Sequence, residues 1–334
     1  MTNHQLFEDR FPVYTEKLIQ VGTEISNTDK DKNRQLVSTL MAIPNADQAF
    51  EPGGKTGINS DGTPLQYCIS VKKEGWGGRF LADPAHTMGN PFERFVQSRI
   101  ALKKLFQISG THELKHFCEE MLDFHLPKGE GLSAYRDGVL WLGAPASGNG
   151  IAVYMDGRNN GWKKFEAWLN QLGISATIQA LSTKATILSI GFEGSSLKNL
   201  RVKVYWRLKE PCLLDDLGID LLKDPEYKIF LNELVQDQEI KLTGLVFSAG
   251  FHLASQQLFD CKIDVCTCKN CVSKSPNQWA ETLAYFTEKY DLAAFPIHNE
   301  LHEKKCEVSY LGFGMDILGN KRMNLYLKAY GTLL

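Results

Sequence analysis

The chain has 334 residues, of which 43% are hydrophobic and 23% are charged, and this composition is ordinary for a globular protein with a large core. Its formal net charge of −2 at pH 7 excludes a general electrostatic attraction to nucleic acid or to an anionic membrane. Any site for an anionic ligand must therefore be formed by cations that cluster locally.

The sequence also gives an expectation for the cellular compartment. It contains no apolar run long enough to span a membrane. The first ten residues are polar and lack the apolar core of a signal peptide, which favours a cytoplasmic location. In that compartment the eight cysteines are expected to be reduced.

The first 64 residues are expected to form two helices and a loop that lead into a sheet. Apolar side chains recur at roughly helical spacing from Leu6 to Ile25. A second helix is predicted over about 30–42, because Pro44 stops it. Residues 45–64 are rich in Gly, Pro, Asn and Asp, which is typical of a loop.

A strand–turn–strand pattern then recurs five times along the rest of the chain, with helical sequence between its copies. The five hairpins begin at LQYCISV, VLWLGA, TILSIGF, LVFSAGF and VSYLGFG. The helical segments between them are expected near 92–126, 162–168, 213–222, 227–235 and 277–289. The hairpins differ in sequence, so this is a repeat of architecture and not of a solenoid consensus.

Ten antiparallel strands expose two unpaired edges unless the sheet closes on itself. We therefore predict an α+β fold in which 1–334 form one domain: a ten-stranded antiparallel β-barrel of five αββα units, coated outside by helices. A barrel of ten strands is wider than one that side chains fill, so it should enclose a cavity. The alternative is an open sheet whose polar face meets water.

Alternation along the second strand of each hairpin separates an apolar face from a polar face. In RVKVYWRL, for example, Lys203, Tyr205 and Arg207 share the parity opposite to the apolar residues. The same parity is shared by Arg79, Asp83, Tyr154, Lys262, Asp264, Tyr326 and Lys328. If the apolar face meets the helices, these side chains converge in the lumen, where buried cations require an anion.

Four cysteines lie close together in the sequence, at Cys261, Cys266, Cys268 and Cys271. Thiolates in such a group could bind zinc, but the spacing does not match paired C-x-x-C motifs. Cys261 also has the apolar parity of its strand. We favour buried small side chains and a loop end, with no metal, and leave zinc as the alternative.

Five αββα units with cations and tyrosines of one parity resemble the ABBA family of aromatic prenyltransferases. The resemblance covers nearly the whole chain, and its local support is strongest in Lys203-Val-Tyr205, in 259–266 and in Tyr326-Leu-Lys328. Members of the family transfer an isoprenyl group from an allylic diphosphate to an electron-rich aromatic acceptor. The resemblance therefore implies a dimethylallyl or geranyl diphosphate donor and an aromatic acceptor, which would be an indole-type compound or a peptide side chain.

The resemblance also implies roles for the residues that share the lumen parity. Tyr205 and Tyr326 would help to bind the diphosphate and would shield the carbocation through cation–π contact. The cations would stabilise the diphosphate as a leaving group. The implied diphosphate ligands are Arg79, Lys203, Lys262 and Lys328, with Tyr154 and Arg207 (at the barrel mouth) as further candidates. The chain has no DDxxD-type aspartate cluster, so no cofactor is obligatory, although Mg²⁺ could assist.

One departure from the family concerns the general base. In members that prenylate indoles, a glutamate on the first strand takes the N–H proton, whereas that strand here offers Gln66 and two small side chains. Asp264 and Asp83 share parity with the cations and could act as the base, or could balance Lys262 and Arg79. A barrel that binds a hydrophobic anion without reacting with it remains the alternative function.

Overall fold

The computed structural model describes residues 11–42, 56, 58–59, 62–126, 131–135, 138–146, 148–174, 181, 183–235, 244–267 and 272–329. Within these residues, no helix combines the length and the apolar character needed to cross a membrane. The first ten residues and most of the predicted loop at 45–64 lie outside the described part of the chain.

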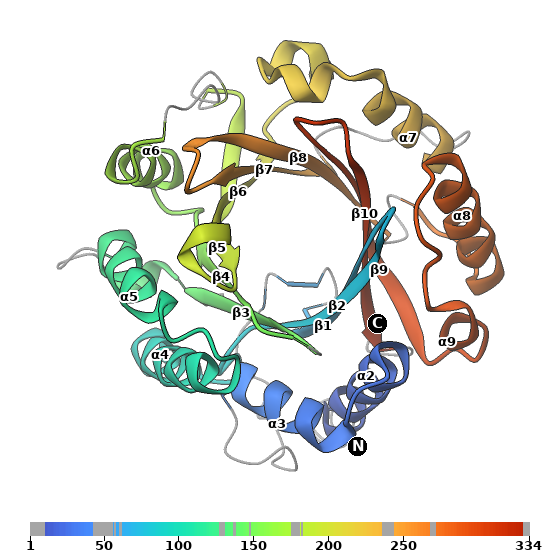
Figure 1. Ribbon diagram of the computed structural model, residues 1–334. Coiled ribbons are helices and arrows are strands. Elements are labelled where there is room, and N and C mark those ends of the chain that lie inside the picture. The colour runs from blue at the N-terminus through green and yellow to red at the C-terminus, as the bar shows by residue number, and fades with distance from the viewer. Residues whose placement is uncertain are drawn as a thin grey trace.

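Ten antiparallel strands form a closed barrel, as Figure 1 shows. The strands are β1 (Leu65–Lys72), β2 (Gly75–Ala82), β3 (Leu140–Pro145), β4 (Ile151–Asp156), β5 (Ala185–Gly194), β6 (Arg201–Leu208), β7 (Val246–His252), β8 (Gln257–Cys266), β9 (Cys306–Asp316) and β10 (Lys321–Ala329). Each strand pairs with its neighbours in sequence, and β1 pairs with β10 to close the sheet. The predicted closed barrel is confirmed, and the open sheet is excluded.

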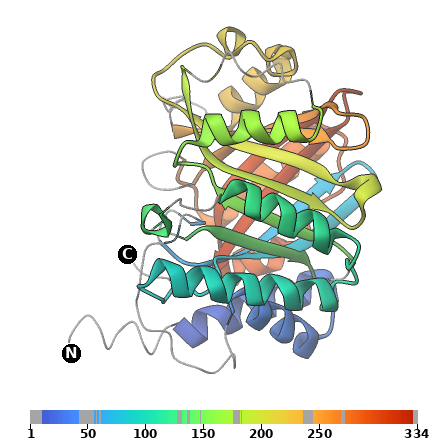
Figure 2. The same cartoon turned by 90° about the vertical axis from the view of Figure 1, so that its left-hand side faces the viewer.

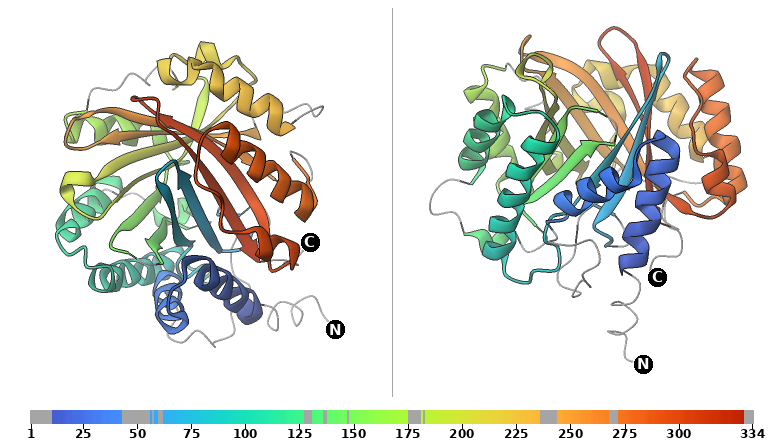
Figure 3. Two further views of the ribbon diagram at one scale, coloured as in Figure 1. Left: turned by 45° about the vertical axis from the view of Figure 1, so that its right-hand side comes forward. Right: turned by 60° about the horizontal axis from the view of Figure 1, so that its bottom comes forward.

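Helices cover the outside of the barrel, as the side views in Figure 2 and Figure 3 show. They are α2 (Phe11–Ser26), α3 (Lys30–Leu40), α4 (Pro91–Ile108), α5 (Leu114–His125), α6 (Gly161–Gln171), α7 (Pro225–Val235), α8 (Pro276–Lys289) and α9 (His298–His302). Segment 92–126 is helical as expected and divides into α4 and α5. The helix expected near 213–222 is a correction, because this segment forms two 3-10 turns. Gly110 and Gly218 adopt positive φ at these breaks, where an α-helix cannot continue.

Local sequence explains where several of the helices begin. At α4, the Asn90 side chain accepts a hydrogen bond from the Phe92 amide, 2.9 Å away, and Pro91 follows at the first helical position. At α8, Ser275 and Gln278 form a reciprocal capping box. These caps fix the helix starts, and thereby the angle at which each helix returns to the barrel.

The main core lies between the outer face of the sheet and the helices. Val202, Val204 and Trp206 on β6 point into this layer and are fully buried, as their parity predicts. On α2, a Cβ at Gly22 would overlap the Phe80 ring, so this helix lies very close to the sheet. The polar parity of the strands is thereby left to line the lumen.

The structure places Cys261 in the layer between sheet and helices, where it is fully buried. Every cysteine in the described ranges is a free thiol, and no group of three metal-binding side chains occurs among the described residues. Cys268 and Cys271 lie outside those ranges, so the zinc alternative stays a prediction.

Candidate active site

Two cavities that share Arg79 lie along the barrel lumen. The polar cavity, of about 500 Å³, opens at the hairpin end and is lined by Cys68, Ser70, Lys72, Glu74, Gly75, Trp76, Gly77, Gly78, Arg79, Pro145, Glu193, Arg201, Lys203, Arg322 and Asn324. The aromatic cavity, of about 150 Å³, is lined by Ile58, Gln66, Arg79, Leu81, Trp141, Tyr154, Leu188, Ser189, Tyr205, Arg207, Val246, Asp264, Tyr310 and Tyr326.

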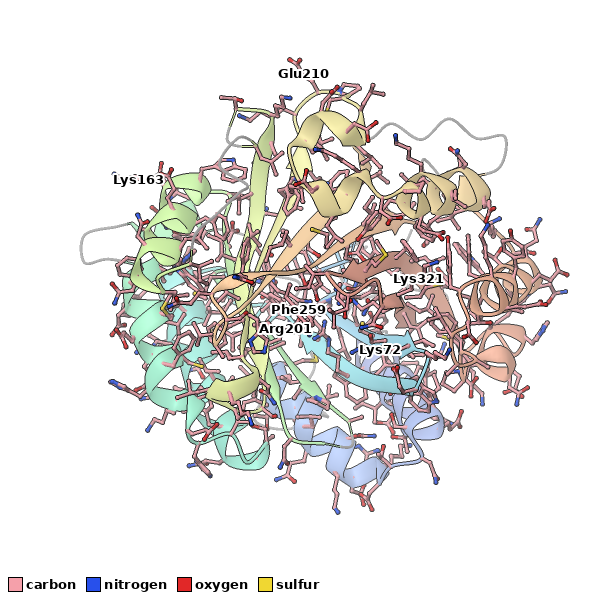
Figure 4. All side chains as sticks on the ribbon, turned by 45° about the horizontal axis from the view of Figure 1, so that its top comes forward. Lys72, Lys163, Arg201, Glu210, Phe259 and Lys321 are labelled. Atoms are coloured by element: carbon pink, nitrogen blue, oxygen red, sulfur yellow. The ribbon has the colours of Figure 1, made fainter. Side chains whose placement is uncertain are left out.

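Strand β6 contributes to both cavities through one alternating run of side chains. Arg201 and Lys203 line the polar cavity, and Tyr205 and Arg207 line the aromatic cavity. Figure 4 places Arg201 over the centre of the barrel and Lys163 on its outer coat. The alternation along the strand therefore determines which side chains face the lumen. The position of a residue along the strand determines which of the two cavities its side chain lines.

Glu193 on β5 is the centre of a buried charge cluster. Its Oε1 lies 3.1 Å from Arg79 Nη1 and 3.3 Å from Lys203 Nζ, and its Oε2 lies 3.2 Å from Arg201 Nη2. Tyr154 also donates its hydroxyl proton to Oε1. Although burial raises the pKa of Glu193, the charges of these three cations hold it well below its usual value.

Two further carboxylates extend this cluster through β8. Asp260 is buried and accepts from both Arg201 and Arg322. Lys262 donates to Asp264 Oδ1 at 2.7 Å and to the Tyr326 hydroxyl at 2.6 Å. The buried cluster thus has five cations (Arg79, Arg201, Lys203, Lys262 and Arg322) and three carboxylates (Glu193, Asp260 and Asp264), an excess of two positive charges when Lys203 is protonated. An anionic ligand would balance this excess.

Lys203 gives the polar cavity a pH dependence. Burial lowers the pKa of the Lys203 ammonium to about 7. The negative charge of Glu193 opposes this shift, and the positive charge of Arg201 adds to it. A bound anion favours the charged ammonium, so binding above pH 7 requires proton uptake. Affinity for inorganic diphosphate is therefore expected to be fullest below pH 7 and to fall by up to about tenfold per pH unit above it.

Titration calorimetry of the wild type and of Lys203→Arg, from about pH 6 to 9, checks this expectation, because arginine stays charged throughout. The ratio of the two affinities cancels the titration of diphosphate itself. The neighbouring Asp260 and Arg322 keep their charges over this range because, although burial disfavours both charges, Arg322 lowers the pKa of Asp260 and Asp260 raises the pKa of Arg322. A ratio that does not change with pH would contradict the shifted pKa of Lys203.

Most of the residues predicted for the site lie where the parity argument put them. Arg79 and Lys203 meet at Glu193 and line the polar cavity, and Tyr205 and Tyr326 line the aromatic cavity. Lys262 faces the lumen but lines neither cavity, and it donates to Asp264 and Tyr326. Tyr154 also lines that cavity, with its ring at right angles to Tyr205 and their centroids 5.5 Å apart. Asp264 lines it too, but is already paired with Lys262.

Asp83 and Lys328 line neither cavity. Strand β2 ends at Ala82, and Asp83 forms a buried ion pair of 2.6 Å with Arg94 on α4, not with Arg79. Burial raises the pKa of Asp83 to about 6, although Arg94 lowers it. We therefore reassign Asp83 from the site to this structural ion pair.

Lys328 and Arg207 lie too far along their strands to join the other diphosphate candidates. Lys328 lies 3.4 Å from Glu307, beyond a register shift in β10 between Tyr326 and Leu327. Arg207 is exposed at the aromatic cavity, four residues from Lys203, which is roughly 13 Å along a strand. Neither is close to the polar cavity.

The sequence argument missed three charged residues of the buried cluster that line the polar cavity. Arg201 and Arg322 have the same parity as Lys203 and Tyr326 on their own strands, so extending the parity count to the strand starts would have found them. Glu193 lies on a first strand, where no charged lumen side chain was expected.

The inward face of β1 is as expected. Gln66 lines the aromatic cavity, and Cys68 and Ser70 line the polar cavity. Gln66 Nε2 donates to the Ile58 carbonyl at 3.0 Å and to Asn59 Oδ1 at 2.6 Å. Its amide orientation is therefore set by the protein.

Known proteins resemble this chain in structure, whereas the comparisons of its sequence found no match. No protein-family model and no curated protein matches the sequence. The structure is similar to 5-dimethylallyltryptophan synthase from Streptomyces coelicolor, with a TM-score of 0.76 and 13% identity over 95% of this chain and 97% of that chain.

Two further solved structures show the same similarity. For 6-dimethylallyltryptophan synthase from Micromonospora olivasterospora, solved in complex with DMASPP and Trp, the TM-score is 0.72 at 15% identity, over 94% of this chain and 95% of that chain. For AnaPT from Neosartorya fischeri the TM-score is 0.67 at 11% identity, over 98% of this chain and 95% of that chain. The chain therefore has the ABBA barrel fold of these aromatic prenyltransferases.

Proposed function

We propose that this protein is an aromatic prenyltransferase, with the whole chain as one catalytic domain. It transfers a dimethylallyl or geranyl group from the diphosphate to an electron-rich aromatic acceptor, with an indole favoured. The observation that carries the proposal is that a cation-rich cavity and an aromatic cavity share Arg79 inside one closed barrel.

The polar cavity suits the diphosphate. Arg79, Arg201, Lys203 and Arg322 all line it, and positioned cations stabilise the charge that develops on the leaving group as the allylic C–O bond breaks. Arginine forks match phosphate oxygens in pairs. Direct binding by these side chains does not require a metal, although Mg²⁺ could assist.

The aromatic cavity suits the carbocation and the acceptor. The rings of Tyr154, Tyr205 and Tyr326 line it and would stabilise the allylic cation through their π faces. The barrel wall would exclude water, which otherwise captures the cation. Holding the acceptor ring beside the cation converts an encounter between two molecules into a positioned reaction.

Solved neighbours support this combination of substrates. The structure of 6-dimethylallyltryptophan synthase contains DMASPP and Trp, an allylic diphosphate analogue together with an indole. We extend that substrate class to this chain, with an aromatic residue of a peptide as the alternative acceptor. A carrier for a hydrophobic anion needs one or two cations at its mouth, whereas Lys203 and Arg322 here are buried. We also propose a cytoplasmic location and a role in secondary metabolism; free thiols agree with that compartment.

The test is a mass-spectrometric assay of purified protein with dimethylallyl and geranyl diphosphates. The acceptor panel contains indoles, tyrosine and aromatic peptides, with and without Mg²⁺. A mass gain of one isoprenyl unit, lost in Lys203→Ala and retained in the exposed control Lys163→Ala, would establish the reaction. No transfer to any acceptor, together with no diphosphate binding by calorimetry, would refute it.

A further inference from the structure

In the proposed reaction, the aromatic carbon that receives the prenyl group still carries its proton. The structure suggests which group removes that proton. The inference rests on the proposed function. Gln66 lines the cavity proposed for the acceptor, but its amide is not a base. Both of its N–H groups point at oxygens that act only as acceptors, because the Asn59 amide itself donates to the Thr63 and Leu65 carbonyls. Among the described contacts, the Gln66 carbonyl oxygen is the part of this amide left to orient a ligand.

Asp264 is the one carboxylate among the described residues that line the aromatic cavity. Lys262 donates to both of its oxygens and also to the Tyr326 hydroxyl. This ammonium neutralises Asp264 and separates it from Tyr326. Asp264 therefore lines the cavity as half of an ion pair, with both of its oxygens already accepting from Lys262.

Tyr154 connects the two cavities differently. Its ring lines the aromatic cavity, and its hydroxyl donates directly to Glu193, which lines the polar cavity. Tyr154 pairs in register with Gly191 on β5, where a Cβ would overlap the Tyr154 ring and the Val153 carbonyl. Only glycine leaves room for the ring to lie across β5 and reach Glu193, two residues further along.

We propose that Tyr154 and Glu193 form a proton relay from the aromatic cavity to the polar cavity. The C–H bond at the substituted carbon of the arenium intermediate breaks, and its electron pair restores the aromatic ring. The proton passes to Tyr154 Oη while the original hydroxyl proton passes to Glu193 Oε1. Tyr154 ends neutral, as it began, and Glu193 ends as a carboxylic acid.

The relay also couples proton removal to binding of the donor. Without a ligand, Arg79, Lys203 and Arg201 hold Glu193 as a weakly basic carboxylate. A diphosphate in the polar cavity competes for the same cations and adds negative charge nearby. Both effects raise the proton affinity of Glu193, so the relay becomes effective only when the donor is in place.

Three variants test the relay: Glu193→Gln, Tyr154→Phe and the control Asp264→Asn. Glutamine still accepts the Tyr154 hydrogen bond but is not a base. Glu193→Gln is expected to bind inorganic diphosphate about tenfold more tightly, since it removes a competing anion. Its kcat is expected to fall about a hundredfold, which is the usual effect of losing a proton acceptor.

An isotope effect distinguishes this role from a structural one. An acceptor deuterated at the substituted carbon should show a larger isotope effect on kcat in Glu193→Gln and Tyr154→Phe, because proton removal becomes rate-limiting. The double variant should be no slower than the slower single variant. Asp264→Asn should leave the isotope effect unchanged.

Three results would overturn the inference, and the failure of the relay can be told apart from the failure of the proposed function. If the wild type transfers prenyl groups but Glu193→Gln and Tyr154→Phe keep its kcat and isotope effect, the relay is wrong and the proposed function stands. The same holds if Asp264→Asn alone acquires the isotope effect. If the wild type transfers to no acceptor, the proposed function fails and the relay fails with it.

Discussion

Replacing Arg79 by glutamine is expected to lower kcat/KM for prenyl transfer by about a thousandfold, the upper end of the effect of removing one positioned donor. Arg79 is the residue that lines both cavities, so its guanidinium lies where the bond between diphosphate and isoprenyl group would break. Steady-state kinetics by product chromatography measures the loss.

The matched control is Lys163→Gln, which removes one exposed cation from α6 and should leave kcat/KM unchanged. Titration with inorganic diphosphate should show weaker binding in Arg79→Gln only. If Arg79→Gln retained kcat/KM within about threefold of the wild type, the leaving group could not lie between the two cavities, and the assignment of Arg79 would be wrong.

Removing the Asp83 side chain is expected to lower the free energy of unfolding by about 3–5 kcal/mol, which is the usual cost of leaving one partner of a buried ion pair uncompensated. The side chains of Asp83 and Arg94 are 0% and 2% exposed, so water does not screen the charge that is left. Denaturant unfolding of Asp83→Ala measures the change.

Two further variants make that result specific. Asp291→Ala removes an acid from an exposed pair with Lys73 and should change the free energy of unfolding by less than about 1 kcal/mol. Asp83→Leu combined with Arg94→Met should recover most of the loss, because no buried charge remains. A variant Asp83→Ala that stayed stable but lost transfer activity would return Asp83 to the catalytic residues.

The face of each strand could be predicted from the sequence because strand side chains alternate strictly. Val204 and Trp206 pack under the helices, and Lys203 and Tyr205 face the lumen, as parity required. Closure of the barrel followed from the need to pair the edge strands β1 and β10. These two arguments were sufficient for the fold and for most of the tyrosines and cations of the site.

The position of each lumen side chain along the barrel axis could not be predicted, because it depends on how neighbouring strands are staggered. Parity therefore grouped Lys328 and Arg207 with Lys203, although register places them toward the other end of the lumen. Asp83 has the lumen parity in sequence but lies beyond the end of β2, where the chain turns toward α4. A parity argument is valid only inside a strand, and strand ends are not marked clearly in the sequence.

Glu193 illustrates a different limit. The first strands of the hairpins contain mostly apolar and small side chains, so a single glutamate in ATILSIGFEG near a turn is ordinary for an exposed strand end. Only the register between β5 and β6 shows that Glu193 pairs with Arg201 and lies within reach of Arg79 and Lys203. Its role depends on the hairpin of β5 and β6 and on β2, which is distant from that hairpin in sequence.

The most direct test of the central claim is the structure of a complex with dimethylallyl thiolodiphosphate and tryptophan. The diphosphate is expected against Arg79 and Lys203 in the polar cavity, and the isoprenyl carbons beside Tyr205 in the aromatic cavity, with the indole facing them. Both ligands bound outside the lumen, or a diphosphate that contacts neither cation, would contradict the assignment of the barrel as the site of prenyl transfer.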